Sequence, residues 1–528
     1  HIFNAEDIAI EGYASKVLAR SLPKWASKLI KPLINLLDKY AQAAAKKGHR
    51  EEKQLDILLA QKFSDLDGLR KNLARLSAAE DDDIESTDLK ELSGEINKVD
   101  PQGIMVDDMM RDQGVAGEKS NKGLSGNLRK LYRKTALWRI LRLVKRYRTY
   151  RYKNANQLIK TFQHSKPKGK DGQGVDLFVA AFVDMGYWLN DFAISNIGSL
   201  SPVIGKVSRL HDGRILPFVA FDPLRNILEK GDALTWVQDA ILKHGFVGVK
   251  MYPPMGFQMS GNEALDKDVA NWPDHLREPH KLKFPRYIKQ EGRQGDVLAE
   301  LPKPHEMGAR LDKELHKLYR WCNDNHVPIM AHTNDSSSPK GRPKNRPHPD
   351  HWEELLKMYP NINFNMGHFG GCDDVARNGP TADDYCGNTC AEPNWTTQIV
   401  NMMSTNKNLF ADFSNFHQVS KSGFKDQIVA GLQALLEQDG GILKSRLLYG
   451  SDWFMGTGRK DNDEYFSDMN TLLGEYFLAE REAILGGNGL SYLGLDRNSE
   501  TMQRLRKFHG DQQPAWLKKL SQQHQIKS

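Results

Sequence analysis

The sequence predicts an α/β protein built on a parallel (β/α)₈ barrel, a TIM barrel, with a large helical insertion between the first and second strands. Three apolar runs carry this prediction, because each stops abruptly where a buried parallel strand would end. They end at His332, His368 and Asp452. The carboxyl ends of barrel strands meet at one rim, so we expect these three side chains to converge on one metal site.

The composition narrows the class of protein. The chain has 528 residues, 39% of them hydrophobic, and a formal net charge of +7, which is modest for this length. No run of about 18 apolar residues predicts a membrane span. Four cysteines in so long a chain do not make a disulfide framework, which favours a reducing compartment. We therefore expect a cytoplasmic protein without a transmembrane segment, and we expect a homo-oligomer.

The pattern divides the chain into four parts. Residues 1–20 are interpreted as the end of the first barrel strand and its following loop, and residues 21–165 as a helical insertion, partly mobile. Residues 166–495 are predicted to hold the rest of the barrel, and residues 496–528 a C-terminal tail. The sequence begins at His1, which we interpret as the last residue of a strand whose start lies upstream.

The most basic stretch of the insertion is residues 128–160, where Lys and Arg alternate with apolar side chains. A basic amphipathic helix of this kind could bind a polyanion such as nucleic acid, an anionic membrane surface or a protein partner. The alternative is a helix that packs on the barrel with its charges in solvent. The sequence leaves both open.

From residue 174 onward, strands and helices alternate, which is typical of a parallel sheet. Strands are predicted at 175–183, 214–221, 246–252, 327–333, 362–368, 409–413 and 446–452, with helices at 233–243, 309–323 and 351–358. A long excursion from the third of these strands to about residue 306 is predicted to form a lid. These are seven strands, and one ending at His1 would be the eighth.

The residue types at the strand ends suit one chemistry. Imidazole and carboxylate groups bind Zn²⁺, and rigid strands fix them while loops leave a coordination position open. The ion lowers the pKa of a bound water to about 7, and a neighbouring carboxylate can take the proton.

Short motifs around these residues resemble the amidohydrolase superfamily, specifically its amidohydrolase-related branch of metal-dependent TIM-barrel hydrolases and decarboxylases. They are Ala-His-Thr at 331–333, Gly-His-Phe-Gly-Gly at 367–371 and Tyr-Gly-Ser-Asp-Trp at 449–453. Residues 248–254 and 485–488 fit the same branch. The resemblance covers about residues 174–495 and the first few residues.

The resemblance implies a role for each of five residues. His332 corresponds to the fifth-strand metal ligand, and His1 to the second histidine of a first-strand His-x-His pair. His368 corresponds to a histidine that binds a second metal or polarises the substrate, and Asp452 to an aspartate that contacts metal and shuttles a proton. Lys250 lies where some members carry a carboxylated lysine that bridges two metals. In other members a lysine nearby only binds substrate or packs, so one ion, Zn²⁺, is our default.

We predict a metal-dependent hydrolase that attacks an amide, ester or lactone of a small molecule with metal-bound hydroxide. Alternatives are a decarboxylase or hydratase of the same superfamily, and a barrel scaffold whose basic insertion binds nucleic acid, membrane or protein. Four further residues are predicted to contact substrate: Tyr252, Trp453, Phe369 and Arg377. An arginine in this place could hold a carboxylate with two hydrogen bonds.

Overall fold

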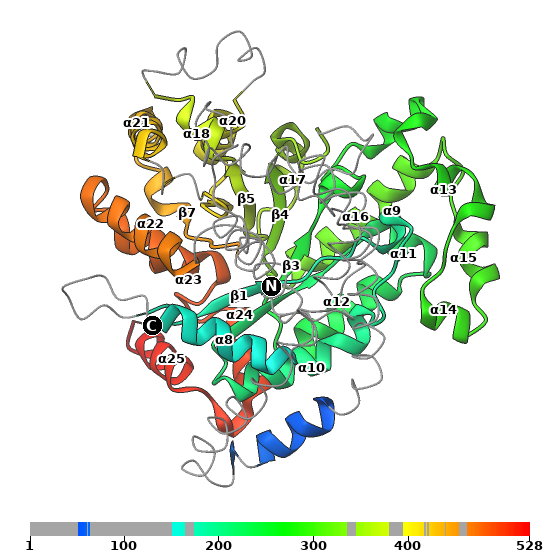
Figure 1. The fold of residues 1–528 in the computed structure, drawn as a ribbon, viewed down its shortest axis with the longest axis horizontal. Helices are drawn as coiled ribbons and strands as arrows, with labels where there is room; N and C mark the ends of the chain where they lie inside the picture. The colour runs from blue at the N-terminus through cyan, green and yellow to red at the C-terminus, as the bar shows by residue number, and fades with distance from the viewer. Residues whose placement is uncertain are drawn as a thin grey trace, which may run out of the picture.

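Seven parallel strands form the central sheet of the computed structural model (Figure 1). They are neighbours in chain order, and each forms hydrogen bonds with the next. The strands are β1 (Phe178–Ala181), β2 (Ile215–Ala220), β3 (Gly248–Met251), β4 (Ile329–Asn334), β5 (Phe364–Gly370), β6 (Leu409–Asp412) and β7 (Leu447–Leu448). Every strand predicted beyond residue 174 is present, and the predicted α/β class is confirmed.

The structure describes residues 51–60, 62–63, 150–163, 174–334, 345–379, 394–416, 419, 422–438, 440–452 and 462–527. Helices connect successive strands within these ranges and surround the sheet in Figure 1. The principal ones are α9 (Gly186–Leu189), α10 (Ile197–Leu210), α11 (Pro223–Leu228), α12 (Asp232–Lys243), α16 (Met307–Asp324), α17 (Glu353–Met358), α18 (Cys372–Ala376), α20 (Trp395–Thr405), α21 (Ser422–Gln438) and α22 (Asn462–Tyr476).

The sheet is curled, so that strands distant in order face one another. A Cβ atom placed on Gly367 of β5 would lie 3.7 Å from Nζ of Lys250 on β3 and 3.6 Å from Oδ2 of Asp412 on β6. In a flat sheet, β3 and β6 would be separated by three strand spacings of about 4.8 Å each. This curvature is that of a barrel wall, as predicted. The strand expected to end at His1 lies outside the described residues.

An apolar cluster fills the inside of the curled sheet below the strand ends. Side chains on a strand alternate in direction, so Phe410 lies on the same face as Asp412, one layer lower. Phe410 and Phe218 of β2 both pack against Tyr492, with ring centroids 5.5 and 6.1 Å away. The segment expected to be a C-terminal tail, 496–528, forms α24 (Glu500–His509) and α25 (Ala515–Lys527), and contributes several side chains to this cluster: Met502, Leu505 and Leu517.

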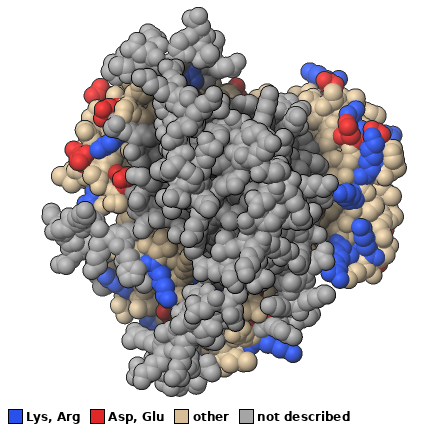
Figure 2. Space-filling view, in the orientation of Figure 1, with Lys and Arg blue, Asp and Glu red and all other residues tan. Residues whose placement is uncertain are grey.

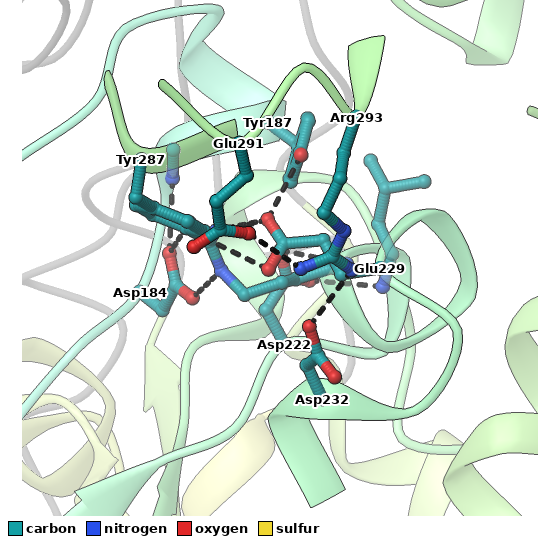
Figure 3. A network of polar contacts seen from close by, with 11 residues as sticks. Asp184, Tyr187, Asp222, Glu229, Asp232, Tyr287, Glu291 and Arg293 are labelled. Carbon is teal, nitrogen blue, oxygen red and sulfur yellow. Dashed lines mark hydrogen bonds and ion pairs between the residues drawn. The ribbon is translucent and has the colours of Figure 1, made fainter. Parts of the chain in front are cut away.

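The excursion after β3 consists of short helices fixed to the outside of the barrel. They are η4 (Pro253–Met255), η5 (Asn262–Lys267), η6 (Val269–Asn271), α13 (Asp274–Arg277), η7 (Pro279–Lys281), α14 (Arg286–Gln290) and α15 (Gln294–Glu300). Figure 3 shows the polar network that holds the excursion against α11 and α12. The hydroxyl of Tyr287 donates to Glu229, 2.7 Å from its Oε1, and Arg293 pairs with Asp232 at 3.0 Å. These contacts do not test whether the segment moves as a lid, so the lid stays a prediction.

Arg225 lies at the centre of the same network. It donates to Asp184, which follows β1, and to Oε1 of Glu229 at 2.6 Å. Asp222 caps the start of α11 and accepts from the indole of Trp188 at 2.8 Å. Burial, followed by the charge of nearby Asp184, raises the pKa of Asp222 to about 7.

Two described pieces of the predicted insertion pack together. Residue Glu51 begins a helical segment and forms a buried ion pair with Arg151 at the start of α8 (Arg151–Gln163), at 2.6 Å. Lys62 donates to the carbonyl of Leu210 at 2.6 Å, which joins this segment to the end of α10. Most of the insertion, including basic residues 128–149, lies outside the described part.

The described surface carries charges of both signs. In Figure 2, Lys and Arg side chains gather around α13, α14 and α15 with Asp and Glu among them. No helix in the described ranges has the length and apolar character needed to cross a membrane. Neither observation identifies a polyanion, a protein partner or an oligomer.

Candidate active site

The structure brings His332 and His368 together. They lie on adjacent strands, β4 and β5, and their imidazole centroids are 4.5 Å apart. Both side chains are buried, with 3% and 9% of their surface exposed. Two imidazoles at the carboxyl ends of neighbouring parallel strands, as the apolar runs predicted, form the centre of the site.

The backbone around the site is conformationally strained. His368, Phe369 and Asp452 all have positive φ angles, of 76°, 44° and 47°. Asn415, just after β6, has a φ of 66°. L-residues avoid this region, at a cost of about 1–3 kcal/mol each, and such residues cluster at functional sites. The strain directs these residues away from the regular course of their strands.

Asp412 and Ser414 hold His368 in one orientation. The Ser414 hydroxyl lies 2.7 Å from Nδ1 of His368 and donates to Oδ1 of Asp412. The carbonyl oxygen of Ser414 lies 3.2 Å from the same Nδ1. A carbonyl can only accept, so the proton sits on Nδ1 and the lone pair on Nε2. Partners of this kind fix the ring of a metal-binding histidine.

Asp412 accepts further hydrogen bonds that keep it in place. Nδ2 of Asn365 donates to Oδ2 at 2.8 Å, and the backbone N–H groups of His368 and Ser414 donate to Oδ1 at 3.1 and 3.0 Å. Lys250 lies nearby, as the Gly367 position shows. Asp412 therefore links β3, β5 and β6 at the level of the two imidazoles.

Asp452 and Lys250 complete the charged groups of the site. Burial raises the pKa of Asp452, while the charges of His368 and Lys250 oppose the rise and Asp412 adds to it. Burial lowers the pKa of Lys250, against the charges of Asp412 and Asp452. Asp452 lies four residues after the end of β7, and its charge interacts with those of His368 and Lys250; its role as ligand and proton carrier stays a prediction.

The predicted substrate-contacting residues have different environments. The ring of Tyr252 lies 4.9 Å from that of His332, beside the two imidazoles. Phe369 is fully buried and packs edge-on against Phe413 at 5.9 Å. Arg377 pairs with Asp374 at 3.0 Å, at the end of α18. Two more predicted residues, Trp453 and His1, lie outside the described part.

The donor set suits a divalent cation but is incomplete within the described residues. Neutral imidazole with a free Nε2 and a nearby carboxylate are ligands that Zn²⁺ binds. Yet no group of three His, Cys, Asp or Glu side chains in the described part is arranged so that it alone could hold a metal ion. Among the described residues the structure brings the two imidazoles together without a third ligand at metal-binding distance, so the metal site stays a prediction.

Sequence reasoning missed Asp412 and Ser414. A signal for Asp412 was available, because residues 409–412 form an apolar run that ends in a carboxylate, as does the run that ends at Asp452. Nothing in the local pattern singles out Ser414, whose role depends on contact with a histidine 46 residues earlier.

Seven parallel strands in a curled sheet, with two buried imidazoles at the carboxyl ends of adjacent strands, are the architecture of a barrel with a candidate active site at its rim. The chain matches the amidohydrolase family over residues 206–495, more than half of its length, and it belongs to that family. The resemblance of the short motifs is thereby confirmed. No curated protein matches the chain.

Solved structures with similar folds have low identity to the chain. A TIM-barrel protein of unknown function from Bordetella bronchiseptica has 14% identity and a TM-score of 0.34, covering 65% of this chain and 84% of its own. A probable 2-pyrone-4,6-dicarboxylic acid hydrolase from Acinetobacter baumannii has 12% identity and a TM-score of 0.32, covering 60% and 82%. A 2,6-dihydroxybenzoate decarboxylase has 16% identity and a TM-score of 0.30, covering 56% and 76%.

Proposed function

We propose that this protein is a metal-dependent hydrolase that cleaves an amide, ester or lactone of a small molecule. The observation that carries the proposal is the pair of buried imidazoles, His332 and His368, with ring centroids 4.5 Å apart. Membership of the amidohydrolase family supports an enzyme, either a hydrolase or a decarboxylase. Fold alone does not select the reaction, so the proposal rests on the site.

Four residues would hold the cation: His332, His368 and Asp452, with His1 as the further ligand expected from the sequence. A divalent ion held there, Zn²⁺ by our proposal, supplies Lewis-acid polarisation of a carbonyl and activation of water at neutral pH. The fixed Nδ1–H tautomer of His368 supports this assignment, because it leaves Nε2 as a donor atom.

The chain's own residues then bind substrate and move protons. Asp452 is our candidate to accept a proton from water and return it to the leaving group, since burial raises its pKa and so makes its carboxylate a stronger base. Tyr252 lies beside His332 and would form one wall for the substrate. Burial lowers the pKa of Lys250 against the charges of Asp412 and Asp452. We keep a single ion as the default, and a second ion would require carboxylation of this lysine.

Elemental analysis of the full-length protein tests the ligand assignment. We expect about one equivalent of metal in the wild type and a large loss in both His332→Ala and Asp452→Ala. The exposed histidine variant His280→Ala serves as the control and should keep its metal. Wild-type metal content in both site variants would refute the assignment.

Product analysis separates hydrolysis from the lyase alternative. Hydrolysis in H₂¹⁸O puts one labelled oxygen into the acid product. A decarboxylase releases CO₂ without consuming water, and this result would replace the hydrolase proposal while keeping the same ligands. We propose a small-molecule substrate in either case.

A further inference from the structure

Three arginine side chains in the described part of the chain are almost completely buried. Arg151 is 3% exposed and pairs with the carboxylate of Glu51. Arg225 is 6% exposed and bonds to two carboxylates of the network in Figure 3. Arg346 is 2% exposed, and no carboxylate of a described residue pairs with it. Arg346 is thus the exception among the buried arginines of the described part.

The guanidinium of Arg346 has little compensation for its burial. Within the described residues it makes one hydrogen bond, from NH2 to Oδ1 of Asn271 at 3.2 Å. A guanidinium has five N–H donors, and burying it without a counter-charge costs several kcal/mol. Burial lowers the pKa of Arg346 to about 10, so it remains charged at neutral pH. In the sequence, residues 336–349 contain no Asp or Glu.

A second unused donor occurs next to the residue that Arg346 contacts. Trp272 follows Asn271 in the chain and is 1% exposed. Its indole Nε1 is buried and has no acceptor among the described residues. Buried polar groups are nearly always hydrogen-bonded, and exceptions call for a missing partner. Among the described residues, the indole of Trp272 has no acceptor and the guanidinium of Arg346 has only one.

Arg346 belongs to the rim that carries the candidate active site. It lies in the segment that follows β4, whose carboxyl end carries His332. Two residues further on, the ring of His348 lies 4.7 Å from that of Trp395. A Cβ atom placed on Gly370, two residues after His368, would lie 3.1 Å from Cβ of Trp395. Trp395 therefore connects the end of β5 with the segment that contains Arg346.

We propose that Arg346 binds the anionic group, a carboxylate or phosphate, of a small molecule at this rim, with the indole of Trp272 as a second donor. The planar guanidinium matches both oxyanions with two parallel hydrogen bonds. A bound anion supplies both the counter-charge that Arg346 lacks and the acceptor that the Trp272 indole lacks among the described residues. This site goes beyond the proposed hydrolysis and uses none of its metal ligands, so either proposal can fail alone.

Calorimetric titration with sodium benzoate and with sodium phosphate, at ionic strength fixed with chloride, tests the site. The full-length wild type should bind one or both saturably. In Arg346→Met the affinity should fall about tenfold or more, the equivalent of a lost charge-assisted hydrogen bond. The control Arg504→Met should bind like the wild type, because Arg504 donates within the fold to the carbonyl of Asn325 and to Thr501.

Thermal unfolding without added anion gives a second readout. Arg346→Met should melt at or above the wild-type temperature because it removes an uncompensated buried charge. Arg504→Met should melt lower. If Arg346→Met does not fold, Arg346→Gln, which keeps a donor for Asn271, replaces it. Wild-type protein that binds neither anion, or an Arg346 variant that binds both like the wild type, overturns the proposal.

Comparing metal-loaded with chelator-treated protein identifies the source of the anion. Benzoate or phosphate affinity that changes with metal occupancy indicates that the anion shares the substrate pocket, and so belongs to the substrate. Affinity independent of metal indicates a separate site for a free anion. Both results support anion binding by Arg346 and differ only in whose anion it is.

Discussion

The hydroxyl oxygen of Ser414 lies 2.7 Å from Nδ1 of His368, and it links that imidazole to the carboxylate of Asp412. This arrangement determines which nitrogen of His368 carries the proton. It also ties the end of β5 to the end of β6, which are neighbours in the sheet. The ring of His368 is therefore oriented before any cation or substrate binds.

Ser414→Ala should weaken metal binding while leaving the fold intact. Loss of a group that orients a metal-binding histidine typically costs about 10–100-fold in metal affinity. We expect a loss of this size in a competition titration of Zn²⁺ against a chromophoric chelator. Ser404→Ala, an exposed serine that bonds only to a local carbonyl, is the matched control. Equal Zn²⁺ affinity in both variants would mean that Ser414 does not orient the ligand.

Asp222→Asn should change how stability depends on pH. Because the pKa of Asp222 in the folded protein is about 7, above its ordinary value near 4, the folded state binds this proton more tightly than the unfolded state. The stabilisation is complete at pH 4 and is lost as the pH rises through 7. The asparagine keeps an oxygen for Trp188 and for the helix cap, and does not ionise.

Urea unfolding from pH 5 to pH 8 measures this effect. The stability of Asp222→Asn relative to wild type should increase by roughly 2–3 kcal/mol over the range. Asp239→Asn, at an exposed position on α12, should show a constant difference. A pH-independent difference for Asp222→Asn as well would show that Asp222 is ionised throughout.

Gly308→Ala should loosen the contact between α16 and the excursion. A Cβ at Gly308 would lie 2.0 Å from the carbonyl oxygen of Asn262 in η5, and backbone cannot yield as a side chain can. We expect a loss of about 1–3 kcal/mol in the free energy of unfolding, or more. Gly295→Ala in α15 meets nothing within 4 Å and should instead stabilise by about 0.5–1 kcal/mol. Destabilisation of equal size in both variants would point away from the η5 contact.

Arg225→Met should strongly destabilise the fold. It leaves Asp184 and Glu229 buried without their counter-charge, which typically costs about 3–5 kcal/mol. The half-exposed pair of Arg310 with Glu300 is the comparison, and Arg310→Met should cost no more than about 1 kcal/mol. Chemical denaturation provides both values. A small effect at Arg225 would mean that solvent compensates the carboxylates.

Local patterns in the sequence were sufficient to locate the strands. Residues 362–368 and 409–413 are apolar runs of strand length, and β5 and β6 lie within two residues of them. The same runs located His332 and His368, because the residue that ends a buried strand is visible in one dimension. The two-residue β7 is the weakest case, since its pairing with β6 is brief.

Contacts between distant parts of the chain could not be predicted in this way. The Ser414–His368 bond spans 46 residues, and that of Tyr287 with Glu229 spans 58. Such pairs depend on register and on helix direction, which local hydrophobicity does not encode.

The sequence by itself determined the alternation of strands and helices, the family and the imidazoles at the strand ends, because periodicity and short motifs are local properties. Only the tertiary structure decided that Asp412 and Ser414 orient His368, that the excursion is bonded to α11 and α12, and that Arg346 is buried without a described carboxylate beside it. The reason is physical: burial and charge compensation are set by groups that chain folding brings together from distant positions.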